Sequence, residues 1–543
     1  MSTTSSPGIR PAVLLFSVLI AAAANAAVAA DSAGQRIYRE GILPSGQPLQ
    51  GTLRNGVALS GAAAACSVCH RRSGLGGGEG QRTVRPIAGR LLFAQPSHGN
   101  ASRPTYTLAT LGRALREGVD PSGRALDELM PRFQLDDDDV MQLAAYLQQL
   151  APGTAPGVSG SEIHFATIIA PGVAPAQEQA MLDTLQAFFA DKNGGTRQEQ
   201  RRRDIGRNVT GSEQMYRAYR KWQLHTWRLK GPPQSWRAQL ENHYRERPVF
   251  AVLSGAGADE WRPVHEFCER NEIPCLFPSI GFSGLAQSGY ASFYFSRGAE
   301  LEAEVLAKHL AASAETSGIV QVFRDEGNGR VPADALRAAL QRRGIDTVID
   351  RPLAGSRPVP DSFWKKLLAD RPKTLILWLN DADIAGFPFR QDAPPLLNGL
   401  YVSGSLVGRD GLPQAQGWRD KVRIVDQLDL AERRARHLTR MNVWLRARNV
   451  PLVDERIQAN AFFAAGIAGD ALAHMDDIFS RDYFIERVEH MTEQSLFYSV
   501  YPRLSLGPGQ RFASKGGYVT RFAQDSGEKD SGDKAALSEW IVP

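Results

Sequence analysis

Residues 66–70 read Cys-Ser-Val-Cys-His, and this pentapeptide limits the fold and chemistry of the chain more than any other segment. The thiols of Cys66 and Cys69 can add to the two vinyl groups of a haem, and the adjacent His70 then lies under the iron as an axial ligand. A thioredoxin-like pair would follow a strand, and a zinc site would need two further ligands nearby. Neither context accompanies this segment. The motif therefore predicts one covalently attached haem c with His70 on the iron.

A second axial ligand is expected from a methionine, since electron-transfer haems often use a thioether. Between residues 31 and 150 the methionines are Met130 and Met141. Met141 lies near the apolar stripe of a predicted helix, where core packing explains it better. Met130 precedes Pro131 in an irregular segment, from which a loop can bring the thioether over the open haem face. We predict Met130 as the sixth ligand, with His98 as the alternative.

The first 30 residues are typical of a secretory signal peptide. Arg10 precedes an uncharged apolar run from Ala12 to Ala24, and small residues follow up to Ala30. The run is too short for a comfortable membrane-spanning helix, and no later stretch holds 18 consecutive apolar residues. We therefore predict export to a bacterial periplasm, with no membrane span after the signal at 1–30 is removed. A retained N-terminal anchor is the alternative.

Residues 31–150 resemble a class I cytochrome c domain. The attachment motif, the proline-containing stretch at 85–89, the Met130-Pro131 pair and a closing helix occur in the order typical of that family. The resemblance implies an all-α domain. It also assigns Pro86 to orienting His70, because in the family a proline carbonyl accepts a hydrogen bond from the ligand histidine.

A segment rich in proline and glycine follows, and it predicts a linker over residues 151–162. From residue 163 to residue 543, short β-rich runs alternate with helical stretches, which favours a doubly wound parallel α/β sheet. The region is too long for one sheet of this kind, so two lobes are expected. Short strands are predicted close to its C-terminus.

This second region resembles the type I periplasmic-binding-protein fold of branched-chain amino-acid receptors. The layout carries the resemblance, most clearly from Val249 to Ile280, where a strand, a glycine turn, a helix and another strand follow one another. In open α/β sheets, ligands lie beyond the carboxyl ends of the strands. Ser254, Gly255 and Ser279 are therefore candidate cleft residues for a small polar ligand, with ordinary turn residues as the alternative.

Cys268 and Cys275 are the other two cysteines, seven positions apart. The first ends a predicted helix and the second begins a predicted strand. In an exported protein they are candidates for a structural disulfide, and two free buried thiols are the alternative.

Composition and motifs narrow the classes of function. A net charge of +5 is small for 543 residues, and no zinc finger, homeodomain or basic helix is present, so nucleic acid is not an expected partner. The chain contains no convincing nucleophile elbow, His-Glu-x-x-His or Walker motif, which favours a carrier over an enzyme.

The two resemblances together imply an exported monohaem cytochrome that transfers single electrons. Its second region would bind a small polar ligand or dock a redox partner such as a periplasmic dehydrogenase or another cytochrome. The alternative is a solute receptor in which the haem is structural or regulatory.

Overall fold

The computed structural model describes residues 32–79, 82–94, 104–150, 154–204, 220–258, 260–281, 289–313, 316–325, 329–355, 359–389, 397–407, 412, 418, 420–475, 478–492, 499–522 and 534–543. The chain divides into two compact units, residues 1–152 and 153–543. The predicted signal peptide at 1–30 lies outside the described residues. Within the described part, no helix combines the length and the apolar character needed to cross a membrane.

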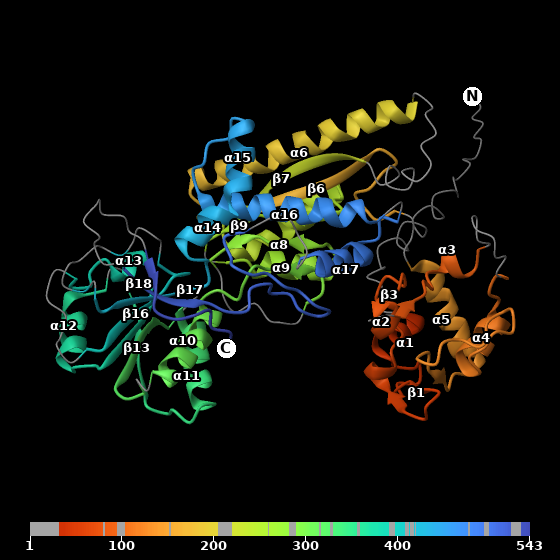
Figure 1. Cartoon of the computed structure of the whole chain (residues 1–543), viewed down its shortest axis with the longest axis horizontal. Coiled ribbons are helices and arrows are strands. Elements are labelled where there is room, and N and C mark those ends of the chain that lie inside the picture. Colours follow the sequence, from red (N-terminus) through yellow and green to blue (C-terminus); the bar gives the residue numbers. More distant parts are fainter. Residues whose placement is uncertain are drawn as a thin grey trace, which may run out of the picture. The chain divides into compact units, whose positions relative to one another are not determined.

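Helices make up most of the regular secondary structure in the described part of the first unit (Figure 1). They are α1 (Ala33–Glu40), α2 (Ser67–His70), α3 (Gly89–Leu92), α4 (Leu108–Arg116) and α5 (Asp137–Gln149). α5 begins at a capping box, in which the Asp136 carboxylate accepts from the Asp139 N–H and the Asp139 carboxylate accepts from the Asp136 N–H. α1 crosses α5 at Gly34, where a Cβ would lie 2.1 Å from the carbonyl oxygen of Gln142. Only glycine lets the two helices approach this closely.

The first unit is not all-α, so that prediction was wrong. β1 (Gln50–Thr52), β2 (Ala58–Ser60) and β5 (Arg132–Phe133) form an antiparallel sheet in the order β2-β1-β5, and β3 (Gly77–Glu79) pairs with β4 (Arg82–Val84). The turn between β1 and β2 contains Asn55-Gly56, with Gly56 at φ +87°. Asn-Gly is a strong hairpin signal because both residues tolerate positive φ. The prediction of an all-α domain did not take this signal into account.

The second unit is built on two sheets. The first has the order β11-β9-β6-β8-β10-β12, with β7 also paired to β6, and all of these pairs are parallel. Its strands are β6 (Glu162–Ile169), β7 (Lys221–Arg228), β8 (Ala251–Leu253), β9 (Ala256–Gly257), β10 (Cys275–Leu276), β11 (Ser279–Ile280) and β12 (Ser292–Phe293).

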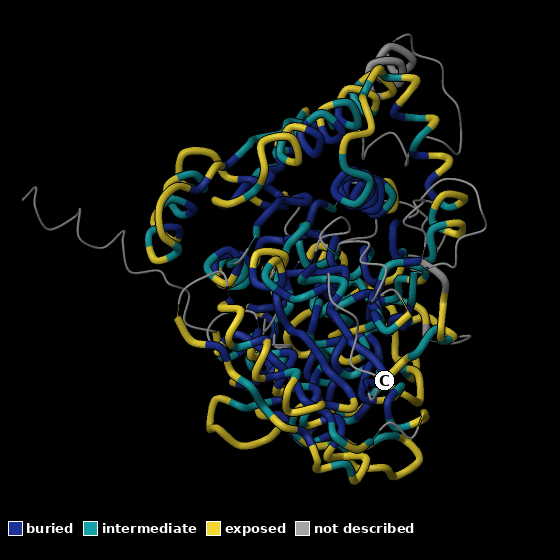
Figure 2. Tube along the Cα trace, turned by 90° about the vertical axis from the view of Figure 1, so that its left-hand side faces the viewer, coloured by how far each residue is buried: buried dark blue, intermediate teal, exposed yellow. Residues whose placement is uncertain are grey.

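The second sheet has the order β14-β13-β15-β16-β17-β18-β19. Its first five strands are parallel: β13 (Ile319–Arg324), β14 (Val348–Leu353), β15 (Thr374–Trp378), β16 (Gly399–Ser403) and β17 (Val422–Asp426). β18 (Tyr518–Phe522) and β19 (Lys534–Ala536) continue the sheet in antiparallel register. β13, β15 and β16 are buried at every position, as continuous apolar runs in parallel sheets should be. Figure 2 shows how far each described residue is buried along the chain.

Helices cover both sheets. They are α6 (Pro175–Asp204), α8 (Trp236–Glu246), α9 (Arg262–Arg270), α10 (Ala299–Ala312), α11 (Arg330–Gln341), α12 (Asp361–Ala369), α13 (Asp381–Ile384), α14 (Ala431–His437), α15 (Thr439–Ala447), α16 (Glu455–Ala473) and α17 (Arg481–Met491). α16 is buried over most of its length, and its aromatic and alanine side chains join the apolar core of the first sheet. The two sheets with their helices are the two lobes of this unit.

The chain passes between the lobes three times: after β12, after β17, and between α17 and β18. These crossings lie side by side. The Tyr294 N–H donates to the Arg511 carbonyl at 2.8 Å, and the Asp429 N–H donates to the Val500 carbonyl at 2.8 Å. Any pocket at this junction is therefore lined by segments far apart in sequence.

The boundary between the two units falls inside the predicted linker. The linker is shorter than the predicted range of 151–162, because Ala155 is buried and its N–H donates to the Phe479 carbonyl at 2.9 Å. Its C-terminal part therefore belongs to the second unit.

Candidate haem site and interlobe pocket

α2 places the two thiols and the imidazole of the attachment motif on a single helical turn. Cys66 is the N-cap residue of α2, and the His70 N–H donates to its carbonyl at 2.9 Å. Neither cysteine is in a disulfide and both are partly exposed, whereas His70 is buried, with 9% of its surface exposed. Burial raises the pKa of the Cys66 thiol to about 12, and the neighbouring Cys69 adds to the effect.

Helix α1 fixes both ends of this turn. The Ser67 hydroxyl donates to the Arg39 carbonyl at 3.2 Å, and the Tyr38 hydroxyl donates to the Arg71 carbonyl at 2.7 Å. Tyr38 is fully buried, so this anchor is also part of the core of the first unit. The position of the motif therefore depends on a helix more than 25 residues earlier in the chain.

The imidazole of His70 is oriented by Arg85, not by Pro86 as predicted. His70 Nδ1 lies 3.0 Å from the Arg85 carbonyl oxygen. A carbonyl only accepts, so Nδ1 carries the proton and Nε2 keeps the lone pair that a metal needs. Pro86 still contributes, because a residue that precedes proline is restricted to extended conformations. The neighbouring Ile87 N–H donates to the Gly74 carbonyl at 2.7 Å, which holds this segment beside the motif.

Burial lowers the pKa of His70, against the opposing effect of the bond to the Arg85 carbonyl. The neutral imidazole is the form that coordinates a metal. Two thiols outside any disulfide and a neutral histidine with its Nε2 lone pair fit the protein side of a covalent haem c site. Among the described residues, no group of three or more His, Cys, Asp or Glu side chains is placed to hold a metal ion.

Met130 is half-buried in the loop that leads into β5. Its N–H donates to the Asp127 carbonyl at 3.1 Å, and the Arg132 guanidinium donates to its carbonyl oxygen. Met141 is 47% exposed, so its predicted core packing was wrong. The buried face of α5 is formed by other residues, including Val140 on the adjacent position. His98 lies outside the described residues, and Met130 as the sixth ligand stays a prediction.

Two of the three predicted cleft residues face the core. Ser254 is fully buried, and its hydroxyl contacts the Met181 sulfur of α6 at 3.6 Å. Gly255 has φ +127°, and a Cβ there would lie 2.9 Å from the Trp261 ring. Their assignment to the cleft was wrong, because α6 and the Trp261 ring cover this turn. Ser279 does line the junction between the lobes.

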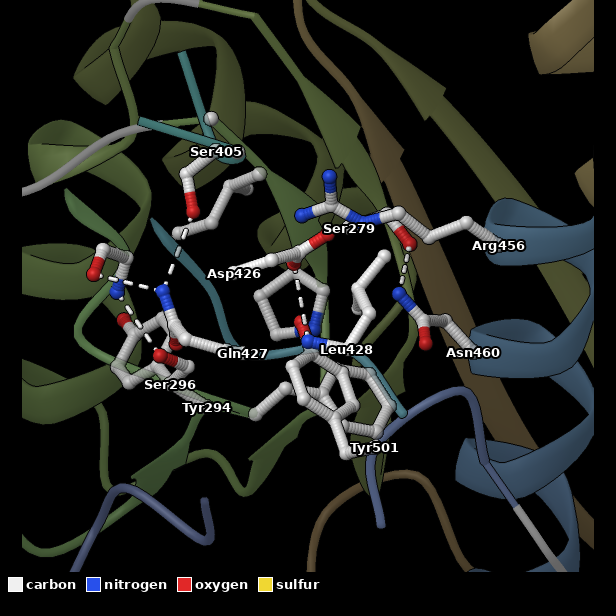
Figure 3. A pocket seen from close by; sticks show the side chains of 16 residues that line it. Ser279, Tyr294, Ser296, Ser405, Asp426, Gln427, Leu428, Arg456, Asn460 and Tyr501 are labelled. Carbon is white, nitrogen blue, oxygen red and sulfur yellow. Dashed lines mark hydrogen bonds between the residues drawn. The ribbon is translucent and has the colours of Figure 1, made fainter. Parts of the chain in front are cut away.

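A small pocket of about 30 Å³ lies at this junction (Figure 3). An adjoining hollow of about 140 Å³ shares Arg456 and the Ser279–Gly281 segment with it. Asn460 Nδ2 of α16 donates to the Ser279 hydroxyl at 3.0 Å, and Gln427 Nε2 donates to the Gly298 carbonyl at 2.7 Å. The polar residues that line the pocket are Ser279, Tyr294, Ser296, Ser405, Asp426, Gln427, Arg456, Asn460 and Tyr501.

Glu302 of α10 lies directly behind the pocket wall and is fully buried. Its carboxyl group contacts the hydroxyl of the lining residue Ser405 at 2.6 Å and Gln427 Nε2 at 3.2 Å. Burial raises the pKa of Glu302 to about 7, and the negative charge of Asp426 adds to this. Tyr501, Asp426 and Glu302 raise the pKa of Arg456, against the effect of its burial.

Sequence reasoning missed this polar cluster, although two of its members carried a signal. Glu302 is an acid between Leu301 and Ala303, and Asn460 lies between Ala459 and Ala461 at the start of a long apolar run. A polar residue inside such a run is expected to have a partner or a ligand.

The predicted disulfide is not present. Cys268 and Cys275 are free, fully buried thiols within hydrogen-bonding reach of each other. Burial raises the pKa of Cys268 well above its ordinary value.

Comparison with known proteins agrees with both resemblances. Residues 54–151 match the family model for cytochrome c. This match implies a covalently bound haem c in the first unit. No curated protein sequence matches the chain significantly.

Solved structures of transporter binding proteins share the fold of the second unit. A fatty acid ABC transporter substrate-binding protein from Thermomonospora curvata has a TM-score of 0.51 at 13% identity, over 72% of this chain and 95% of that one. A possible leucine/isoleucine/valine-binding protein from Rhodopirellula baltica has a TM-score of 0.51 at 15% identity, and the match covers 71% of this chain and 98% of that one. A branched-chain amino acid ABC transporter from Thermus thermophilus with bound valine has a TM-score of 0.51 at 10% identity, and the match covers 71% of this chain and 98% of that one.

These similarities establish the fold of the second unit and not its ligand. The first unit thus matches the cytochrome c family model over residues 54–151, and the second unit has the type I periplasmic-binding-protein fold.

Proposed function

We propose that the protein is an exported monohaem c-type cytochrome that transfers one electron at a time, and that its second unit binds a small ligand or docks a redox partner. The observation that carries the proposal is the geometry of residues 66–70. Two thiols and a buried histidine share one turn, and the Arg85 carbonyl leaves His70 Nε2 as the coordinating atom.

In this proposal each residue has a separate task. Cys66 and Cys69 would hold the haem through thioether links, and His70 and Met130 would bind its iron. Arg85 orients the imidazole and raises its basicity through the bond to Nδ1. When bound, haem c supplies reversible one-electron chemistry. The signal at residues 1–30 would direct the chain to the periplasm, where a dehydrogenase or another cytochrome would exchange electrons with it.

The second unit supports a binding role through its interlobe pocket. Polar side chains from both lobes and from all three crossings converge there. The Thermus thermophilus protein with the same fold holds valine, which supports a small polar ligand for this chain. The pocket also favours a second candidate function, a solute receptor in which the haem is structural or regulatory.

Optical spectra of the periplasmic protein, oxidised and reduced, test the proposal, together with a haem stain after denaturation. Sharp reduced bands and haem that survives denaturation are expected. A weak red-edge thioether band should be lost in Met130→Ala and kept in Met141→Ala, the matched control on the exposed side of α5.

Three results would count against the proposal. A chain without covalent haem would leave only a binding protein. A thioether band that survives Met130→Ala would remove Met130 from the iron. A haem that is not reduced by small cytochromes or dehydrogenases, in a protein that binds a solute tightly, would favour the receptor.

A further inference from the structure

The interlobe pocket contains two buried acceptor oxygens without a hydrogen-bond donor. Oε1 of Gln427 and Oδ1 of Asn460 have no partner among the described residues. Gln427 is 2% exposed and Asn460 is 1% exposed, and both line the pocket. Buried polar atoms are rarely left unpaired, because burial without a partner costs the full desolvation of the group. These oxygens therefore point to a ligand that brings donors.

The orientation of the Gln427 amide is fixed by its neighbours (Figure 3). Nε2 donates to the Gly298 carbonyl at 2.7 Å, to the Ser405 hydroxyl at 3.1 Å and to Glu302 at 3.2 Å. A backbone carbonyl has no proton to give, so the amide oxygen cannot exchange places with the nitrogen. Oε1 is an acceptor that neither lobe supplies with a donor in the described residues.

The charges around the pocket favour a cation. The pocket and the adjoining hollow are lined by two carboxylates, Asp426 and Asp454, and by one guanidinium, Arg456. Glu302 lies behind the lining residues Ser405 and Gln427 and adds further negative charge when it ionises. Arg456 already faces Tyr501 and Asp426. An anionic ligand would therefore meet net negative charge, which disfavours it.

Among the described residues, Arg456 is the one cationic side chain that lines the pocket and the adjoining hollow. Ser254, one of the predicted cleft residues, contacts Met181 in the core and so offers the pocket no donor. The Ser279 hydroxyl accepts from Asn460 Nδ2, so it offers a carboxylate one neutral donor and no positive charge. A ligand with an ammonium group is thus better matched than one that also carries a carboxylate.

We propose that this pocket binds a small primary amine that lacks an adjacent carboxylate. A protonated primary amine has three donors and no acceptor, which suits a lining that offers the oxygens of Gln427, Asn460 and Asp426 as acceptors. The proposal rests on the ligand-binding half of the proposed function and narrows its ligand to one chemical class.

Calorimetric titration of the full-length haem-loaded protein tests the ligand class with four probes of similar size. n-Butylamine, n-butyrate and n-butanol differ only in the terminal group, and valine combines amine and carboxylate. We expect n-butylamine to bind at least about ten-fold more tightly than each of the others, since a hydrogen bond to a charged group is worth that factor or more.

Variants of Asn460 test the site. Asn460→Leu removes the acceptor and should lower the affinity for n-butylamine by about ten-fold, whereas Asn460→Asp should raise this affinity. Asn442→Leu is the matched control, because Asn442 Oδ1 on α15 is also buried and without a partner among the described residues but lies outside the pocket. This variant should bind n-butylamine like the wild type.

Each contrary outcome has a distinct meaning. Tighter binding of valine or n-butyrate would overturn the amine class and leave a binding domain in place. Equal binding of n-butanol would overturn the charge argument. Absence of binding by all four probes, or an equal loss in Asn442→Leu, would overturn the proposal, while the haem spectra report on electron transfer independently.

Discussion

Glu302 is expected to make the second unit less stable as the pH rises. Burial raises the pKa of this side chain from its ordinary 4.5 to about 7. Between these values the folded state keeps a proton that the unfolded state releases, so the free energy of unfolding falls with increasing pH. At 1.36 kcal/mol per pKa unit, the loss is about 3 kcal/mol once the pH exceeds the folded pKa.

Glu302→Gln should abolish this loss because glutamine resembles the protonated acid. Oε1 accepts from the Ser405 N–H at 3.0 Å, from the Ser405 hydroxyl at 2.6 Å and from Gln427 at 3.2 Å, which an amide oxygen can also do. The other oxygen contacts the Ser403 hydroxyl, which also accepts from the Leu406 N–H at 3.2 Å. An amide NH2 can donate to the Ser403 oxygen, as the acid proton would.

We expect the variant to match the wild type within about 1 kcal/mol at pH 5 and to exceed it by up to about 3 kcal/mol at pH 8. Urea unfolding followed by tryptophan fluorescence measures this difference. All nine tryptophans lie at or after Trp222, so the signal reports on the second unit. Glu432→Gln, at an exposed position of α14, is the control and should keep the wild-type pH dependence.

Two results would refute the reasoning about Glu302. If wild type and variant lose stability in parallel between pH 5 and pH 8, a different group titrates. If the variant is less stable at every pH, the folded state needs the ionised carboxylate, and the raised pKa is not the dominant effect.

Two further substitutions test the packing of each unit. Gly34→Ala should destabilise the first unit by about 1–3 kcal/mol, because its Cβ would meet the α5 backbone, whereas Gly78→Ala has open space. The shift of the haem absorption bands during thermal unfolding would show the difference, and equal effects would contradict the close crossing. Arg324→Met removes the 2.6 Å ion pair of the buried Asp383 carboxylate and should lower the free energy of unfolding in urea by about 3–5 kcal/mol. Arg330→Met is the control: it removes an exposed ion pair and should lower the free energy of unfolding by less than about 1 kcal/mol.

The sequence by itself determined those features that depend on neighbouring residues. The attachment motif is one helical turn, so the spacing of Cys66, Cys69 and His70 already contains its chemistry. The apolar runs of the parallel strands are also local, because a strand buried on both faces must be apolar at nearly every position. Asn55-Gly56 was equally local, and the missed hairpin there was a failure to read an available signal.

Only the tertiary structure decided the partners of these residues. The carbonyl that orients His70 comes from Arg85, because the folding of residues 74–88 brings that atom, and not the one on Pro86, to Nδ1. Ser254 turns into the core because α6 supplies Met181 to cover it. The interlobe pocket joins Ser279, Gln427 and Asn460, which meet only where three crossings of the chain lie together. Such contacts depend on sheet order and helix packing, and no pattern of adjacent residues encodes them.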